Sequence, residues 1–108
     1  MRTLSFIVTV AGGIRKDPTC SFSGLRPKPE EPIRVEFTFP DSWERSVKVV
    51  GFYNRDHQEC EPRALDDNNS CEIPAEVMMD FVFYMRVYGR SQRDTFATEL
   101  TAVCLDGR

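Results

Sequence analysis

The sequence has no apolar run long enough to cross a bilayer as a helix, because such a segment needs about 20 mostly apolar residues. It also has no excess of positive charge, since 17 acidic residues outnumber 14 basic ones and give a formal net charge of −3. Proteins that bind duplex nucleic acid usually concentrate lysine and arginine to replace phosphate counterions. We therefore expect neither a membrane nor a nucleic acid as the partner of this chain.

Residues suited to catalysis are scarce. His57 is the only histidine, and it lies in a polar turn with no sign of a partner that would orient it as a base. The four cysteines, Cys20, Cys60, Cys71 and Cys104, include no close C-x₂-C pair of the kind that binds zinc. We interpret the cysteines as buried free thiols, and one or two disulfides are the alternative, since four cysteines allow three full pairings.

The acidic pairs do not form a recognisable motif either. Acids at 30–31, 59 and 61, and 66–67 lie in turns, whereas a glycosidase needs two carboxylates facing across a cleft. The run 66–69 lacks the spacing of a calcium-binding EF-hand loop. We predict no catalytic residue, no cofactor and no metal.

Strand signals recur along the chain, because apolar and polar residues alternate with the period of two that half-buried strands require. They fall at residues 3–10, 33–39, 46–53, 58–65, 81–88 and 95–104. Residues 15–32 contain four prolines and are predicted to form a loop or an edge. A helical turn is predicted near residues 74–79, where Pro74 suits a first helical position. Six or seven strands without a long helix indicate one all-β domain over residues 1–108, a sandwich or partly closed barrel.

The same alternation predicts which side chains form the core. One face of the first strand carries Leu4, Phe6, Val8 and Val10, and one face of the second carries Ile33, Val35, Phe37 and Phe39. Val47, Val49, Val50 and Phe52 are too apolar to be exposed on both faces of their strand, and Thr98, Leu100, Ala102 and Cys104 share one face of the last. Trp43 is predicted to fold back and plug the core.

Aromatic residues offer the one candidate binding surface. Tyr53, Tyr84 and Tyr88, with Phe52, have rings that are able to stack on the apolar faces of a sugar. Core packing and cross-strand pairing are the commoner roles of such residues. We name Tyr53, Tyr84 and Tyr88 as possible surface-binding residues.

Five segments, in order, resemble a known pattern. Residues 35–43 and 47–53 resemble an F-x-F-x-x-x-W … A-x-F arrangement. Residues 66–77 resemble a turn followed by C-x-I-P-x-E-V/W-L, and residues 83–89 resemble the x-V-x-V-Y-G strand that follows it. Residues 98–103 are similar to a closing T-T-x-x-x-x-V strand.

These segments resemble small phage and prophage tail- or baseplate-associated structural proteins with an immunoglobulin-like β-domain. The chain departs from that pattern at residues 11–32, which are longer and richer in proline, and at 78–80, where a Pro-Gly-containing turn is expected. The resemblance implies an immunoglobulin-like β-sandwich of antiparallel strands and carries no catalytic residues.

The resemblance also implies a function. It indicates a non-enzymatic assembly module that contacts other virion or tail proteins and is a possible homo-oligomer. Such a module is expected in the virion, or in the host cytoplasm during assembly. The first alternative is a carbohydrate- or cell-surface-binding module that uses the three tyrosines. The second is a small enzyme centred on His57 or on a reactive cysteine.

Overall fold

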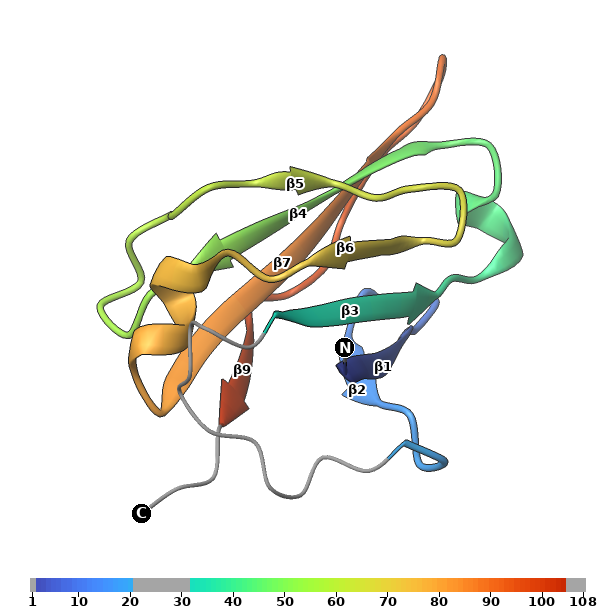
Figure 1. Ribbon diagram of the computed structural model, residues 1–108. Coiled ribbons are helices and arrows are strands. Elements are labelled where there is room, and N and C mark those ends of the chain that lie inside the picture. The colour runs from blue at the N-terminus through green and yellow to red at the C-terminus, as the bar shows by residue number, and fades with distance from the viewer. Residues whose placement is uncertain (1, 21–31, 105–108) are drawn as a thin grey trace.

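The chain folds as a sandwich of two β-sheets, seen in the computed structural model in Figure 1, which describes residues 2–20 and 32–104. One sheet has the order β2 (Ile14–Lys16), β1 (Arg2–Val8), β3 (Ile33–Thr38) and β6 (Ser70–Glu72). The other has the order β5 (Arg63–Ala64), β4 (Val47–Tyr53) and β7 (Val82–Arg90), with β8 (Thr95–Ala97) and β9 (Thr101–Cys104) both along the far side of β7. Two 3-10 helices, η1 (Asp41–Trp43) and η2 (Ala75–Met79), complete the described ranges, in which no helix is long and apolar enough to cross a membrane. The predicted β-sandwich is confirmed.

Alternating side chains from both sheets fill the space between them. The inward residues of the strands are Leu4, Phe6 and Val8 in β1, Val35 and Phe37 in β3, Val50 and Phe52 in β4, and Phe83, Met85 and Val87 in β7, each at most 2% exposed. The core faces predicted for residues 3–8 and 33–37 are therefore confirmed. Val10 is an exception, because β1 ends at Val8 and leaves Val10 86% exposed in the turn that follows.

The strand neighbours follow the immunoglobulin-like arrangement. The antiparallel pairs β3–β6, β4–β7 and β7–β9 correspond to the neighbours B–E, C–F and F–G of such a sandwich. The expectation of antiparallel strands is wrong for one pair, because β1 and β3 are parallel. After β1 the chain turns at Gly12, at a φ of +92°, and β2 runs back antiparallel to β1 as far as Phe6. Further along the chain, β3 runs in the same direction as β1 and pairs with it.

Residues 15–32 were predicted to form a loop or an edge, and Ile14–Lys16 form the edge strand β2. Of the predicted proline-rich loop, residues 21–31 lie outside the described residues. The weak strand predicted at residues 58–65 is reduced to β5 at the edge of its sheet, with an isolated bridge between Tyr53 and Glu59 before it. Pro62, just before β5, has no amide hydrogen to donate to a ladder.

A β-bulge divides the last predicted strand. Tyr88 pairs with Ala97 and Met85 pairs with Thr101, so β7 advances three residues where the chain opposite advances four. Inside the bulge the amide of Thr98 donates to the carbonyl of Val87, and the Thr98 hydroxyl accepts from the Val87 amide, both at 3.0 Å. The bulge reverses the alternation, so the prediction of one shared face is wrong: Thr98 is buried, whereas 102 and 104 are exposed.

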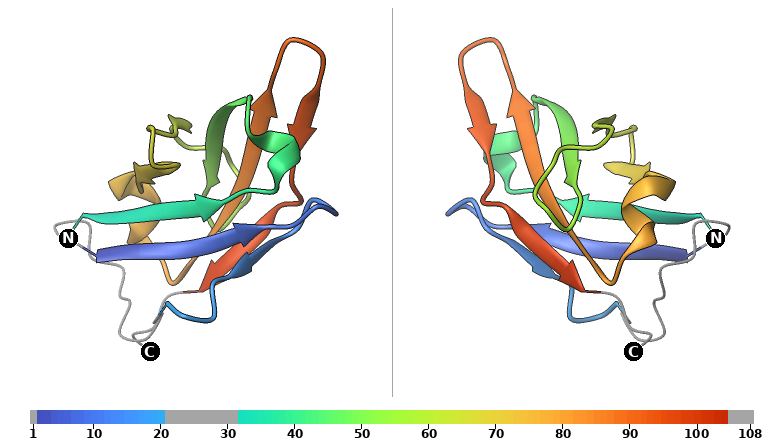
Figure 2. Two further views of the ribbon diagram at one scale, coloured as in Figure 1. Left: turned by 90° about the vertical axis from the view of Figure 1, so that its right-hand side faces the viewer. Right: turned by 90° about the vertical axis from the view of Figure 1, so that its left-hand side faces the viewer.

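Two short 3-10 helices close the sandwich. The predicted helical turn is confirmed as η2, whose Val77 and Met78 are buried. Figure 2 shows η1 beside the base of the β7–β8 hairpin, which extends beyond the rest of the molecule. Trp43 of η1 is buried, as expected of a core plug, and stacks on Phe39 and Phe96 with ring centroids 5.1 and 4.9 Å away.

The indole of Trp43 leaves no space for a side chain at residue 89. A Cβ at Gly89 would lie 2.8 Å from Cε3 of Trp43, closer than carbon atoms approach without a shift. We expect Gly89→Ala to lower the free energy of unfolding by about 1–3 kcal/mol, measured by denaturant titration. Gly13→Ala is the control, because its new Cβ would approach Thr9 Oγ1 only to 3.4 Å. Equal stability of the two variants would contradict this packing.

Candidate functional site

The three tyrosines singled out in the sequence lie on the same side of the same sheet. Tyr53 of β4 is directly opposite Tyr84 of β7, and Tyr88 of β7 is directly opposite Val49. Their strand neighbours Phe52, Phe83 and Val87 are fully buried, so the alternation turns the tyrosines away from the core. Phe52, grouped with them in the sequence, faces the interior and does not belong to this surface.

We call this side of the five-stranded sheet the outer face. Its strand positions are Val47, Val49, Gly51 and Tyr53 in β4; Ala64 in β5; Val82, Tyr84, Arg86, Tyr88 and Arg90 in β7; Thr95 and Ala97 in β8; and Ala102 and Cys104 in β9. Twelve of these fourteen positions are uncharged, and the other two are arginines. The surface is therefore a mainly apolar and aromatic sheet face with positive charge along its central strand.

Contacts between the rings hold the tyrosines in place. The hydroxyl oxygens of Tyr53 and Tyr88 are 2.8 Å apart and share a hydrogen bond, and each residue is only partly exposed. The edge of the His57 ring meets the ring of Tyr84, with centroids 4.3 Å apart. Burial, together with the hydrogen bond to Tyr88, raises the pKa of Tyr53 well above its ordinary value. The row is thus ordered before any ligand arrives.

An apolar hollow of about 410 Å³ lies at one end of the outer face. It is lined by Val47, Val49, Tyr88, Gly89, Arg90, Thr95 and Phe96. The strand was expected not to be exposed on both faces, and Val50 and Phe52 are indeed buried, whereas Val47 on the outer face is 72% exposed. The outward register of residue 47, opposite Arg90 near the end of the sheet, leaves its side chain without a covering neighbour.

The two outer faces of the sandwich differ in character. Outward positions of β3 are Arg34, Glu36 and Thr38, and those of β1 are Thr3, Ser5 and the apolar Ile7. Arg34 on that side has its own partners, since it pairs with Asp66 at 2.8 Å and donates to Ser70 at 3.0 Å. A mostly polar sheet surface needs no further cover, so the five-stranded sheet presents the face that gains more from a partner.

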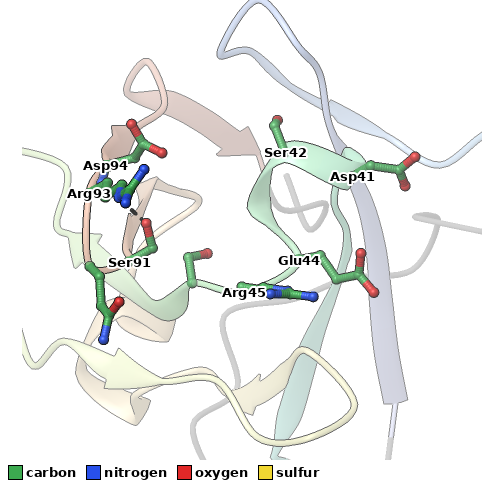
Figure 3. A pocket seen from close by; sticks show the side chains of 9 residues that line it. Asp41, Ser42, Glu44, Arg45, Ser91, Arg93 and Asp94 are labelled. Atoms are coloured by element: carbon green, nitrogen blue, oxygen red, sulfur yellow. Dashed lines mark hydrogen bonds between the residues drawn. The ribbon is translucent and has the colours of Figure 1, made fainter.

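A charged cleft of about 590 Å³ separates η1 from the β7–β8 hairpin. Figure 3 shows Asp41 and Glu44 on the η1 side, and Ser91 and Asp94 on the hairpin, where the Ser91 hydroxyl accepts from the Asp94 amide at 3.2 Å. Acidic and basic side chains both line the cleft, so its charge does not select a ligand of one sign. Across residues 2–20 and 32–104, no three His, Cys, Asp or Glu side chains group closely enough to hold a metal ion.

His57 and the cysteines were the remaining candidates for chemistry. His57 is exposed in its turn, at a φ of +64°, and within the described ranges its ring has no hydrogen bond to an acid or a thiol. None of the four cysteines forms a disulfide within the described ranges, as interpreted, but only Cys71 is buried, and Cys104 is exposed. Burial raises the pKa of the Cys71 thiol to about 11, which keeps it protonated and unreactive at neutral pH.

Comparisons with protein-family models, with curated proteins and with solved structures found no match for this chain. The resemblance to phage tail and baseplate proteins therefore remains a prediction. The functional conclusion depends on the surfaces of the molecule itself.

The raised pKa of Tyr53 has a consequence for stability. Above about pH 10 the tyrosine ionises in the unfolded chain but stays protonated in the folded one, so the free energy of unfolding falls as the pH rises. We expect Tyr53→Phe to lose less stability than the native protein between about pH 9 and 11, in denaturant titrations at each pH. Tyr84→Phe is the matched control. An unchanged pH dependence in Tyr53→Phe would contradict the raised pKa of Tyr53.

Proposed function

We propose that this domain is a non-enzymatic binding module that docks on another protein through the outer face of its five-stranded sheet. The observation that supports this proposal is the contrast between the two sides of the sandwich. The outer face exposes valine, alanine and a tyrosine row, whereas the outward strand positions of β1 and β3 on the opposite sheet are polar except for Ile7. A mainly apolar and aromatic surface that includes arginine is typical of protein–protein contact sites.

The construction of the face favours binding at low entropic cost. Tyr53 and Tyr88 are restrained by their shared hydrogen bond, and Tyr84 is restrained by His57. Side chains that are already ordered lose little rotamer freedom when a partner covers them. Tyrosine is also among the residues that contribute most to binding energy at protein interfaces. The central pair of strands therefore supports a rigid, preorganised contact surface.

The partner that we propose is another virion or tail protein. This part of the proposal draws on the sequence resemblance, in which such domains belong to phage or prophage tails and baseplates. A module with one docking face and one hydrated face suits a position at the surface of a larger assembly. It would be found in the virion, or in the host cytoplasm during assembly.

A photo-crosslinking amino acid tests the docking face. We expect the probe at position 47 or 97, on the outer face, to crosslink to another protein chain in cells that assemble the particle. The matched controls are positions 36 and 38, which are exposed outward positions on the opposite sheet. Crosslinking that is as strong from the control positions would contradict the proposed face. Mass spectrometry of the product tests the rest, because a partner unrelated to virions would contradict the virion role.

A carbohydrate-binding module is the second candidate. The observation that favours it is that Tyr53, Tyr84 and Tyr88 lie on one face, where aromatic rings are able to stack on sugars. The valines, alanines and apolar hollow beside the tyrosines fit a protein partner better than a sugar, whose many hydroxyl groups need polar contacts.

A glycan array separates the two candidates. If the domain binds sugar, Tyr84→Ala will lower the array signal by about tenfold, because one stacked ring is worth roughly 1 kcal/mol or more. In that case Val47→Asp, at the apolar hollow, will leave the signal unchanged. If the domain binds protein, the array will give no signal, and Val47→Asp will weaken the crosslinking from position 97.

A further inference from the structure

Two residues of opposite charge lie on the outer face, and neither has an ion-pair partner within the described part of the chain. Arg86 is the central outward residue of β7 and is directly opposite Gly51. Glu59 is directly opposite Tyr53 through an isolated bridge, so it joins the same face beside β4. Three ion pairs occur among residues 2–20 and 32–104, and neither Arg86 nor Glu59 takes part in one.

The two charges lie close together on the surface. The Oε2 atom of Glu59 is 3.1 Å from the place that a Cβ of Gly51 would occupy, so its carboxylate lies over Gly51. Gly51 itself is the residue opposite Arg86. Both charges also contribute to the pKa of Tyr53, which Glu59 raises and Arg86 lowers. An acid and a base thus flank one small position near the middle of the tyrosine row.

Arg86 has more to gain from a partner than a solvated surface arginine. Its side chain is partly buried, and its Nε is shielded from solvent without a hydrogen-bond acceptor in the described part of the chain. A partly desolvated cation attracts a carboxylate more strongly than a cation in water does, because the effective dielectric constant is lower. A partner of this face therefore needs an acid near Arg86.

We propose that this partner is a second copy of the chain, joined face to face in a twofold-symmetric dimer. The proposal rests on the proposed function, since it uses the same docking face. In a twofold-symmetric interface, if residue i of one protomer contacts residue j of its partner, then residue j of the first protomer contacts residue i of the partner. Arg86 then pairs with Glu59 of the partner subunit, and Glu59 pairs with Arg86 of the partner subunit. One contact geometry neutralises all four charges.

The position of Gly51 suits this arrangement. The symmetry axis passes between Arg86 and Glu59, which places it near the one outward residue of β4 that has no side chain. Gly51 itself is buried beneath the Glu59 carboxylate and the Tyr53 ring, so these two side chains form the surface that meets the partner subunit near the axis. The tyrosines and valines of both protomers then cover one another around the axis, and the face that is apolar in the monomer becomes the centre of the dimer.

The size of the face predicts a weak dimer. Its fourteen strand positions and Glu59 are fewer than the roughly 20–30 residues per side of a standard stable interface. We expect dissociation constants on the order of 10–100 μM, a strength at which a further partner is able to displace the second copy.

Charge reversal tests the proposal with the whole chain. We expect sedimentation velocity between about 5 and 500 μM to show concentration-dependent dimers of the native protein. Arg86→Glu and Glu59→Arg each place like charges opposite one another, twice per interface, and each raises the dissociation constant about tenfold or more. Mixing the two variants at equal concentration restores both attractive pairs and hence restores dimers. No merely structural role of either residue predicts that recovery.

Matched controls make the same charge changes elsewhere. Arg15→Glu and Glu36→Arg lie at exposed positions of the four-stranded sheet, on the opposite side of the sandwich, and leave dimerisation unchanged. If Arg86→Glu fails to fold, as judged by its thermal unfolding, Val47→Asp replaces it, because residue 47 is 72% exposed and tolerates a charge in the monomer. Val47→Asp is expected to abolish the dimers.

Two results would overturn the second copy as partner: a native protein that stays monomeric up to about 500 μM, or a mixture of variants that stays monomeric. The photo-crosslinks to another protein from position 47 are independent of this measurement. If these crosslinks persist although the protein is monomeric, the docking face is supported and only the dimer is refuted. If the protein is dimeric but gives no crosslink to another protein, the virion partner is refuted and the dimer is supported.

Discussion

Seven residue pairs hold β4 against β7, from Val47 opposite Arg90 to Tyr53 opposite Tyr84. This register assigns every side chain of the two central strands to one side or the other. It turns Val50 and Phe52 into the core and Tyr53 out to the surface. A slip by one residue would exchange the two sets and expose the apolar residues of both strands, so the buried core and the docking face are fixed by the same set of backbone hydrogen bonds.

Patterns within short segments were sufficient to predict the structural features that depend on residues close together in the sequence. The period of two identified the core faces of β1 and β3, and Pro74 marked the start of η2. The failures occur where distant segments meet. The parallel pairing joins β1 to β3 across the intervening strand β2, and the bulge after Ala97 contains a hydrogen bond between Thr98 and Val87 across two strands. Neither contact leaves a periodic trace in the sequence.

The candidate surface shows the same division between local and long-range information. Residue type alone identified the tyrosines, but only the β4–β7 register brings Tyr53 beside Tyr84. Arg86 was available to sequence reasoning, because it lies two residues from both Tyr84 and Tyr88 and alternation puts all three on one face. Glu59 was not, since an isolated bridge beyond the end of β4 places it there.

Trp43 is the only tryptophan of the chain, and it is buried between Phe39 and Phe96 at the base of the β7–β8 hairpin. Its fluorescence therefore reports the closure of this end of the sandwich. The aromatic residues of the outer face are tyrosines, which absorb and emit at shorter wavelengths than an indole. Folding and surface occupancy consequently have separate optical signatures in the unmodified protein, so that a ligand-induced change in one is distinguishable from partial unfolding detected by the other.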